Sequence, residues 1–246
     1  MIRFLIGILF VVLYLILSIP ILLVETVIRH FNPEAAEKSM LRIVQWVFWV
    51  IYHIAGVKVT VIGRENIPED QAALFVGNHQ GFFDVIVGYT LMKTRTGFIA
   101  KKSFEKVPLL SWNMKFLYCL FLDREDLKQG LKTILTAIDY VKSGISIFIY
   151  PEGTRNKSGD ETNLAEFHGG SFKIAQRTKC PIIPVAVNHT EAVFEKQFPR
   201  IKPQHVIIEF GEPVYYQDLP REDQKQVGEY FRVKIRDMVI KNQAAV

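Results

Sequence analysis

The stretch AALFVGNHQGFFD (residues 72–84) joins an apolar run of strand length to a polar, glycine-containing turn and then to a second apolar pattern. Residues 72–76 are predicted to form a buried strand that is followed by a loop and the first turn of a helix. In open α/β sheets, ligands bind at the carboxyl ends of the strands. The polar residues behind this strand are therefore the first candidates for chemistry.

Further apolar runs alternate with helical patterns along the chain, which is typical of an α/β sheet layered with helices. The predicted strands are residues 57–62, 72–76, 97–100, 145–150, 182–187 and 206–210. Residues 127–141 carry apolar side chains at helical spacing, and residues 157–163 are polar and predicted to form an exposed loop.

The N-terminus is the most apolar part of the chain. No charged side chain occurs from Phe4 to Val24, and a helix of roughly 20 residues spans the hydrocarbon layer of a bilayer. No small-residue cleavage pattern follows, so we expect a retained anchor that crosses the bilayer or re-enters it. A second stretch, Ile43–Val57, contains Trp46 and Trp49, whose rings favour the headgroup level. The alternative is that both stretches are core-packing helices of a soluble domain.

We therefore divide the chain into membrane-associating helices (1–56) and an α/β domain (57–246). The net charge is +5, and no basic run is interleaved with aromatic residues, so a phospholipid membrane fits better than a nucleic acid as partner. The two cysteines, Cys119 and Cys180, lie in apolar surroundings. We therefore expect no disulfide framework and a reducing compartment. The expected location is the membrane, with the catalytic domain on its cytoplasmic face.

His79 and Asp84 form the first candidate pair. Five residues turn a regular helix by about 500°, which would leave the two side chains about 140° apart. They can meet if His79 lies in the loop and Asp84 in the first helical turn, with Gly81 giving the backbone freedom to bend. Asp84 would then fix one ring nitrogen and leave the other free as a general base. The alternative is a helix-capping aspartate beside a structural histidine.

A second polar cluster follows another strand, at Tyr150-Pro151-Glu152-Gly153-Thr154-Arg155-Asn156. Proline ends the strand, glycine permits a left-handed turn, and Arg155 supplies a planar fork that matches phosphate oxygens. The cluster is either an anion site or a charged surface turn.

Other basic residues offer further anion contacts. Two roles are open for the basic residues of this region: a binding site for a phosphate, anionic headgroups or an acidic carrier, or a solvated charged face. The residues are Lys93, Arg95, Lys101, Lys102 and Lys106. Asp123 and Arg124 follow an apolar run and form either an ion pair or a phosphate ligand.

No nucleophile is evident in the sequence. There is no Gly-x-Ser-x-Gly elbow, and neither cysteine has a polar setting. No metal-ligand spacing occurs, so neither a metal nor a cofactor is expected. A base and an anion site without a nucleophile indicate direct attack by a hydroxyl of the substrate.

Taken in order, four blocks resemble the glycerolipid acyltransferase family, specifically the 1-acylglycerol-3-phosphate acyltransferases. The blocks are Asn78-His79 with Asp84, Phe121-Leu122-Asp123-Arg124, Pro151-Glu152-Gly153-Thr154-Arg155 and Ile182-Ile183-Pro184-Val185. They extend over residues 57–211. The resemblance implies a single mixed sheet flanked by helices, as in glycerol-3-phosphate acyltransferases.

The resemblance also implies the reaction. An acyl group passes from acyl-CoA or acyl carrier protein to the sn-2 hydroxyl of lysophosphatidic acid, giving phosphatidic acid. His79 would deprotonate the hydroxyl and Asp84 would orient it. The implied substrate-binding residues are Asn78, Lys101, Arg124, Glu152, Gly153, Thr154 and Arg155.

One block departs from the family pattern. Where the family commonly has Phe-Lys-x-Gly, this chain has Phe167-His168-Gly169-Gly170. The missing lysine raises the alternative that the acceptor is another lysolipid or glycerol-3-phosphate. A further alternative is a membrane protein that binds anionic lipids without catalysis.

Overall fold

The computed structural model describes residues 1–156 and 158–244. Its helices are α1 (Ile2–Phe31), α2 (Pro33–Ala55), α3 (Phe82–Thr90), α4 (Pro108–Phe116), α5 (Leu127–Lys142), α6 (Lys173–Thr178), α7 (Arg221–Lys225) and α8 (Val227–Gln243). Its strands are β1 (Lys58–Ile62), β2 (Leu74–Gly77), β3 (Thr96–Lys101), β4 (Leu120–Leu122), β5 (Ser146–Ile149), β6 (Ile182–Asn188) and β7 (His205–Phe210).

The strands form one sheet in the order β1-β7-β6-β2-β5-β3-β4. Neighbouring strands are parallel except β6 and β7, which are antiparallel. The sheet is therefore mixed, as predicted. Strands β2, β3, β4, β5 and β6 run in the same direction, so their carboxyl ends meet at one edge, and the residues that follow them are brought together there.

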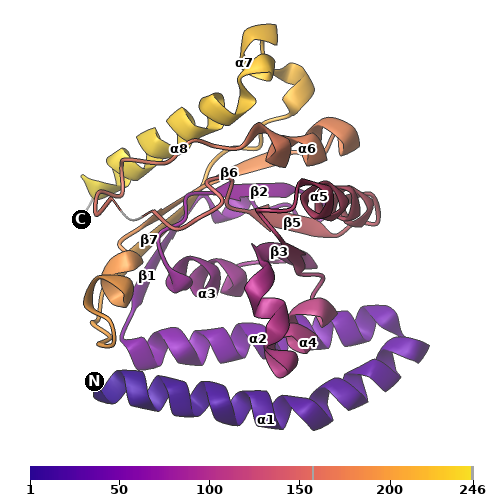
Figure 1. Ribbon diagram of the computed structural model, residues 1–246, viewed down its shortest axis with the longest axis vertical. Helices are drawn as coiled ribbons and strands as arrows, with labels where there is room; N and C mark the ends of the chain where they lie inside the picture. Colours follow the sequence, from indigo (N-terminus) through magenta and orange to yellow (C-terminus); the bar gives the residue numbers. More distant parts are fainter. Residues whose placement is uncertain (157, 245–246) are drawn as a thin grey trace.

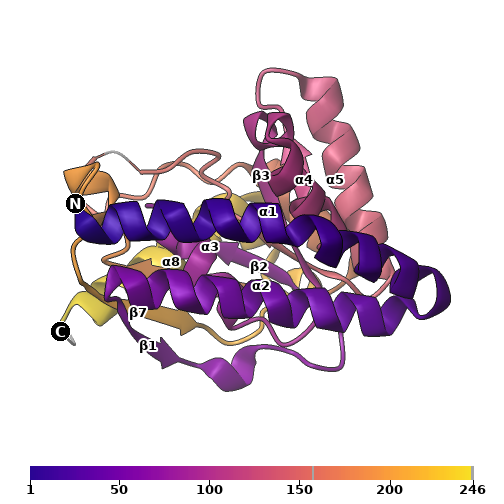
Figure 2. The same cartoon turned by 90° about the horizontal axis from the view of Figure 1, so that it is seen from below.

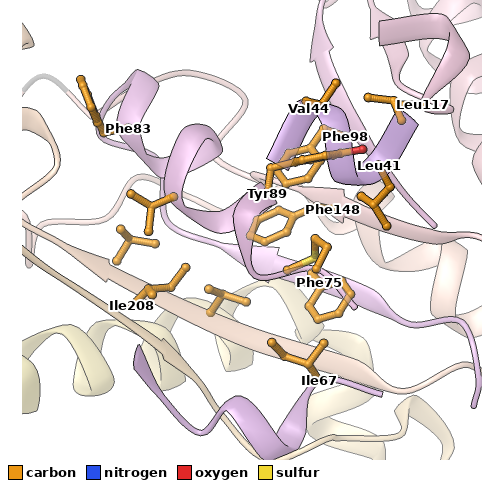
Figure 3. Packing of buried hydrophobic residues seen from close by; sticks show 14 of the residues in the cluster. Leu41, Val44, Ile67, Phe75, Phe83, Tyr89, Phe98, Leu117, Phe148 and Ile208 are labelled. Atoms are coloured by element: carbon orange, nitrogen blue, oxygen red, sulfur yellow. The ribbon is translucent and has the colours of Figure 1, made fainter. Parts of the chain in front are cut away.

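Helices cover both faces of the sheet (Figure 1). On one face, α2, α3 and α4 pack over a cluster whose centre is aromatic. The Phe148 ring stacks on Phe75 and Phe98, with centroid separations of 5.8 and 4.6 Å, and Tyr89 of α3 lies against Phe98 (Figure 3). On the other face, α5, α6 and α8 cover a mainly aliphatic cluster. The core therefore consists of two apolar layers, one on each face of the sheet.

The two N-terminal helices form an antiparallel hairpin that lies over the α3 side of the sheet (Figures 1 and 2). Asn32 caps α2 by accepting the Ala35 N–H at 3.1 Å, and α2 buries Met40 and Val44 in the core. This helix is thus part of the packed domain rather than a free appendage. The helix ends at Gly56, which has a left-handed φ of 75°.

Helix α1 differs from α2 in its exposure. Within the described residues, α1 is the helix that is long and apolar enough to cross a membrane, and 11% of its most apolar window is buried. Leu9, Leu13 and Leu17 are among its exposed side chains. This exposure disfavours the alternative of a core-packing helix, because such a helix would bury this surface.

The predicted strands all form, with ends shifted by up to two residues. Strand β4 is an addition, because a three-residue run is too short to show alternation in the sequence. The predicted helix at 127–141 is α5, which Asp126 caps by accepting the Lys128 and Gln129 amides.

Candidate active site

His79 lies in the loop behind β2, and Asp84 lies in the first turn of α3. The His79 Nδ1 atom is 2.7 Å from Asp84 Oδ2, so the contact predicted from the spacing is confirmed. Because an ionised carboxylate only accepts hydrogen bonds, Nδ1 carries the proton and Nε2 carries the lone pair. His79 is partly exposed and Asp84 is fully buried. The basic nitrogen is therefore Nε2.

Asp84 is held by more than the imidazole. Its Oδ2 atom accepts the backbone N–H groups of Gln80 and Gly81 at 2.6 and 2.9 Å, and its Oδ1 atom accepts the Thr190 hydroxyl. The aspartate caps α3 and contacts the His79 ring at the same time, so capping does not exclude the predicted orientation of the imidazole. Thr190 follows β6, and nothing in the local sequence links it to Asp84.

Gly81 is needed for space rather than for backbone freedom. Its φ of −158° is an extended conformation that any residue adopts. A Cβ atom at this position would lie 2.6 Å from Glu195 Oε2. The expectation that Gly81 lets the chain bend is therefore wrong: the absent side chain leaves room for a carboxylate.

Asn78 precedes His79 and is fully buried. Its side-chain amide donates to the Val187 carbonyl at 2.9 Å and accepts the Val187 N–H at 2.8 Å. The amide thus continues the β2–β6 pairing beyond Gly77. In the structure Asn78 is a buried support for the His79 loop, and its predicted contact with the substrate stays a prediction.

Tyr150, the residue that follows the neighbouring strand β5, supports His79. The two rings stack with their centroids 4.3 Å apart and their planes 18° apart. The Tyr150 hydroxyl is buried, and burial, with a smaller contribution from the Asp84 charge, raises the pKa of this phenol. The phenol therefore stays neutral beside the imidazole. Sequence reasoning missed this contact, because the residues are 71 positions apart (79 to 150).

Glu152 fastens the second polar cluster to the first. Its buried carboxylate accepts the His79 N–H at 2.7 Å and the Ala165 N–H at 3.1 Å. Asn156 adds a backbone bond to the His79 carbonyl at 2.7 Å. Burial raises the Glu152 pKa, and the bonds from the two amides partly offset this effect. Both carboxylate oxygens of Glu152 thus accept hydrogen bonds from backbone amides.

Arg155 lies at the surface of the same cluster, with 39% of its side chain exposed. Its guanidinium carbon is 4.7 Å from the centroid of the Phe82 ring, and Nη1 is 3.1 Å from Glu195 Oε1. Phe82 begins α3, so Arg155 and His79 lie at the same end of that helix. Thr154 is exposed, and Gly153 has the left-handed φ of +71° expected of a glycine turn.

Two further predicted residues lie along the same sheet edge. The Arg124 Nε atom would be 3.9 Å from a Cβ placed on Gly153, and the His168 ring would be 3.4 Å from it. Arg124 and His168 are therefore brought to the glycine turn. Lys101 is exposed at the end of β3, and the adjacent Lys102 pairs with Asp123 at 3.0 Å. Asp123 thus forms its ion pair with Lys102 rather than with Arg124.

The arrangement comprises a partly exposed histidine, a buried carboxylate that contacts one of its ring nitrogens, and a partly exposed guanidinium at the same helix end. Within residues 1–156 and 158–244, no group of three or more His, Cys, Asp or Glu side chains is placed to hold a metal ion. These groups suit the removal of a proton from a hydroxyl that belongs to an anionic molecule.

Comparison with known proteins gives three findings. The family described as "Acyltransferase" matches residues 58–188. A 1-acyl-sn-glycerol-3-phosphate acyltransferase of Borreliella burgdorferi is 30% identical over 192 residues, which cover 76% of this chain and 72% of the relative. The enzyme of that name from Saccharomyces cerevisiae is 28% identical over 202 residues, or 80% of this chain and 65% of the relative.

The fold has a counterpart among solved structures. The 1-acyl-sn-glycerophosphate acyltransferase PlsC of Thermotoga maritima matches with a TM-score of 0.83 and 24% sequence identity, over 99% of this chain and 95% of that one. This likeness establishes the fold, including the N-terminal helical hairpin.

Proposed function

Because the chain belongs to the acyltransferase family, we propose that it transfers an acyl group from a thioester to the sn-2 hydroxyl of 1-acylglycerol-3-phosphate, giving phosphatidic acid. The donor is acyl-CoA or acyl carrier protein. The observation that carries this proposal is the 2.7 Å contact between His79 Nδ1 and the buried Asp84, which leaves Nε2 free to accept a proton. The curated relatives bear the name of this activity.

The proposed reaction proceeds by direct attack. His79 Nε2 removes the proton of the sn-2 hydroxyl, and the oxygen attacks the thioester carbonyl carbon to form a tetrahedral intermediate. The carbon–sulfur bond then breaks, and the leaving thiolate takes the proton from the imidazolium. Asp84 stabilises the imidazolium, as the aspartate of a catalytic triad does. No covalent enzyme intermediate is required.

Arg155 is the proposed site of the acceptor phosphate. Its partly exposed guanidinium lies against the ring of Phe82, the first residue of α3, and a planar fork binds two phosphate oxygens at once. Arg124, His168 and Lys101 lie along the same sheet edge as additional donors for the headgroup. Asn78 and Glu152 are proposed to act through the backbone of the His79 loop.

The membrane is the proposed location of this reaction, with the catalytic domain on the cytoplasmic face. The exposed apolar surface of α1 supports a contact with lipid. An enzyme held at the bilayer spares its acceptor the transfer of an acyl chain into water, which costs about 0.8 kcal/mol per CH₂.

A second acceptor remains a specific alternative because His168 stands at the position where a lysine was expected. His168 lies at the Gly153 turn, and an imidazole offers one or two hydrogen-bonding nitrogens there in place of the three donors of a lysine. A panel of acceptors that includes glycerol-3-phosphate and other lysolipids separates the two possibilities by their products.

The test of the base is acyl transfer by purified protein in micelles with lysophosphatidic acid. Replacement His79→Ala should lower kcat by about 10²–10⁴-fold, the usual contribution of general acid–base catalysis. His53→Ala removes an exposed histidine of α2 and serves as the matched control. Near-normal turnover by a folded His79→Ala protein would show that another group is the base.

The phosphate site is tested separately. Arg155→Ala should raise the KM for lysophosphatidic acid with a smaller change in kcat, because the substitution removes a binding group and leaves the base in place. An unchanged KM would remove Arg155 from the site.

A further inference from the structure

Glu195 reaches the active site from a part of the chain that no motif marks. It lies in a short turn, Glu195–Gln197, that follows β6, and its side chain is 16% exposed. Its Oε1 atom accepts the backbone N–H of Phe82 at 2.8 Å and the Arg155 Nη1 at 3.1 Å. One carboxylate oxygen therefore binds both the first amide of α3 and the guanidinium of the proposed phosphate site.

The other oxygen of this carboxylate is poorly satisfied. Glu195 Oε2 is buried and has no hydrogen-bond partner, and it lies where a side chain at Gly81 would have to be. Burial raises the Glu195 pKa, and the Phe82 amide and the Arg155 charge only partly offset this effect. A buried acceptor without a donor costs free energy, so the carboxylate is held less firmly than its two bonds alone would suggest.

The donors that Glu195 occupies are those that a phosphate group uses. The amino end of a helix and an arginine fork are both common phosphate ligands, and the helix dipole favours a negative charge at that end. A guanidinium that is already paired with a carboxylate attracts a second anion less strongly. Glu195 is thus chemically a substitute for the phosphate at this position.

We propose that Glu195 is an internal competitor of the acceptor phosphate for Arg155 and the Phe82 amide, and so determines how tightly phosphate-bearing lipids are held. This inference rests on the proposed function. Lysophosphatidic acid and phosphatidic acid carry the same phosphomonoester, so the competition weakens the binding of substrate and product alike. Weaker retention of the product lets phosphatidic acid leave a site that would otherwise hold it.

The decisive variant is Glu195→Gln, which keeps an oxygen for the Phe82 amide and removes the charge. We expect the KM for lysophosphatidic acid and the inhibition constant of phosphatidic acid to fall by the same factor, about three- to tenfold, since one neutralised ion pair of a half-exposed arginine has a modest effect. Inhibition by diacylglycerol, which has the same chains without the phosphate, should not change. Competition predicts this joint shift, whereas a merely structural carboxylate does not.

Glu191→Gln is the matched control, because Glu191 lies in the same segment and pairs with Lys196 at 3.2 Å rather than with Arg155. Its constants should equal those of the unaltered protein. If Glu195→Gln fails to fold, Glu195→Asp replaces it. This variant keeps the charge and shortens its reach by one methylene, so both constants should fall by a smaller factor.

The outcomes distinguish a failure of the competition from a failure of the proposed acyltransferase function. A raised KM for lysophosphatidic acid in a folded Glu195 variant would mean that Glu195 orients Arg155 for the phosphate, and the competition would be refuted. Unchanged constants would refute it as well, provided that Arg155→Ala raises the KM. Absence of acyl transfer by the unaltered protein would instead overturn the proposed function, and an unchanged KM in Arg155→Ala would remove Arg155 from the phosphate site and the competition with it.

Discussion

Asp84 accepts hydrogen bonds from the His79 ring, two backbone amides and the Thr190 hydroxyl. The carboxylate is fully buried, so each donor offsets part of the cost of keeping its charge away from water. Thr190 has no contact with substrate in the proposed reaction. It is a positioning residue, since its hydroxyl fixes the carboxylate that in turn fixes the imidazole.

Replacement Thr190→Val keeps the shape of the side chain and removes this donor. We expect kcat to fall about tenfold with little change in KM, because Asp84 Oδ1 loses its hydrogen-bond donor. The free energy of unfolding should fall by about 1–3 kcal/mol for the same reason. Thr190→Ser retains the hydroxyl and should restore kcat. Steady-state kinetics and chemical denaturation measure the two effects. Loss of stability without loss of kcat would show that the hydroxyl serves folding alone.

The sequence predicted the contacts that are local and missed those that are distant. The His79–Asp84 contact follows from a five-residue spacing, which local geometry constrains. Tyr150 and Thr190 follow β5 and β6, and Glu195 lies in a short turn beyond β6, so they reach the site through the order of the strands in the sheet and the path of the chain behind β6. Single-sequence patterns contain no information about that order. The roles of His79 and Arg155 in the reaction stay predictions until they are measured.

At the scale of elements, α1 presents an apolar stripe to its surroundings. Leu9, Leu13 and Leu17 are spaced four residues apart on one face of the helix, with 59, 48 and 61% of their surfaces exposed. The sequence predicted this helix from its uncharged length. It did not predict that α2 packs into the core, because the apolar residues of α2 resemble those of an interfacial helix.

Replacing the three leucines of this stripe with glutamate should release the protein from liposomes. Each leucine side chain that enters the bilayer contributes about 1.5–3 kcal/mol to the free energy of membrane binding. Flotation with anionic vesicles measures the bound fraction. Helix α5 supplies a matched control with exposed Leu127, Leu131 and Leu135 at the same spacing. The α1 variant should remain folded and active in micelles. Equal release of both triple variants would mean that α1 is not the principal lipid contact.

At the scale of the whole molecule, the amino end of α1 meets the active site through aromatic rings. The Phe4 ring stacks on Phe194 at 5.7 Å and contacts Phe198 at 6.1 Å. Phe194 in turn lies 6.3 Å from Phe82, the first residue of α3 and a neighbour of Arg155. Helix α1 and the proposed headgroup site are thus joined by a chain of contacts beside Glu195, although they are far apart in the sequence.

This link should matter for acceptors that arrive from a bilayer and not for acceptors that arrive from water. Phe4→Ala removes the contacts that hold α1 against Phe194 and Phe198, and each lost ring contact is worth about 0.5–1.5 kcal/mol. We expect the KM for long-chain lysophosphatidic acid in vesicles to rise about threefold to tenfold, in keeping with such energies. The KM for a short-chain, water-soluble analogue should not change.

Phe31→Ala is the control for this substitution, because Phe31 is a highly exposed phenylalanine at the opposite end of the same helix. It should leave both KM values unaltered. An equal rise for the soluble and the vesicle-borne acceptor in Phe4→Ala would mean that Phe4 supports the site itself. No rise for either would mean that α1 orients the enzyme through its lipid face alone, and the aromatic contacts would then be packing without a part in substrate delivery.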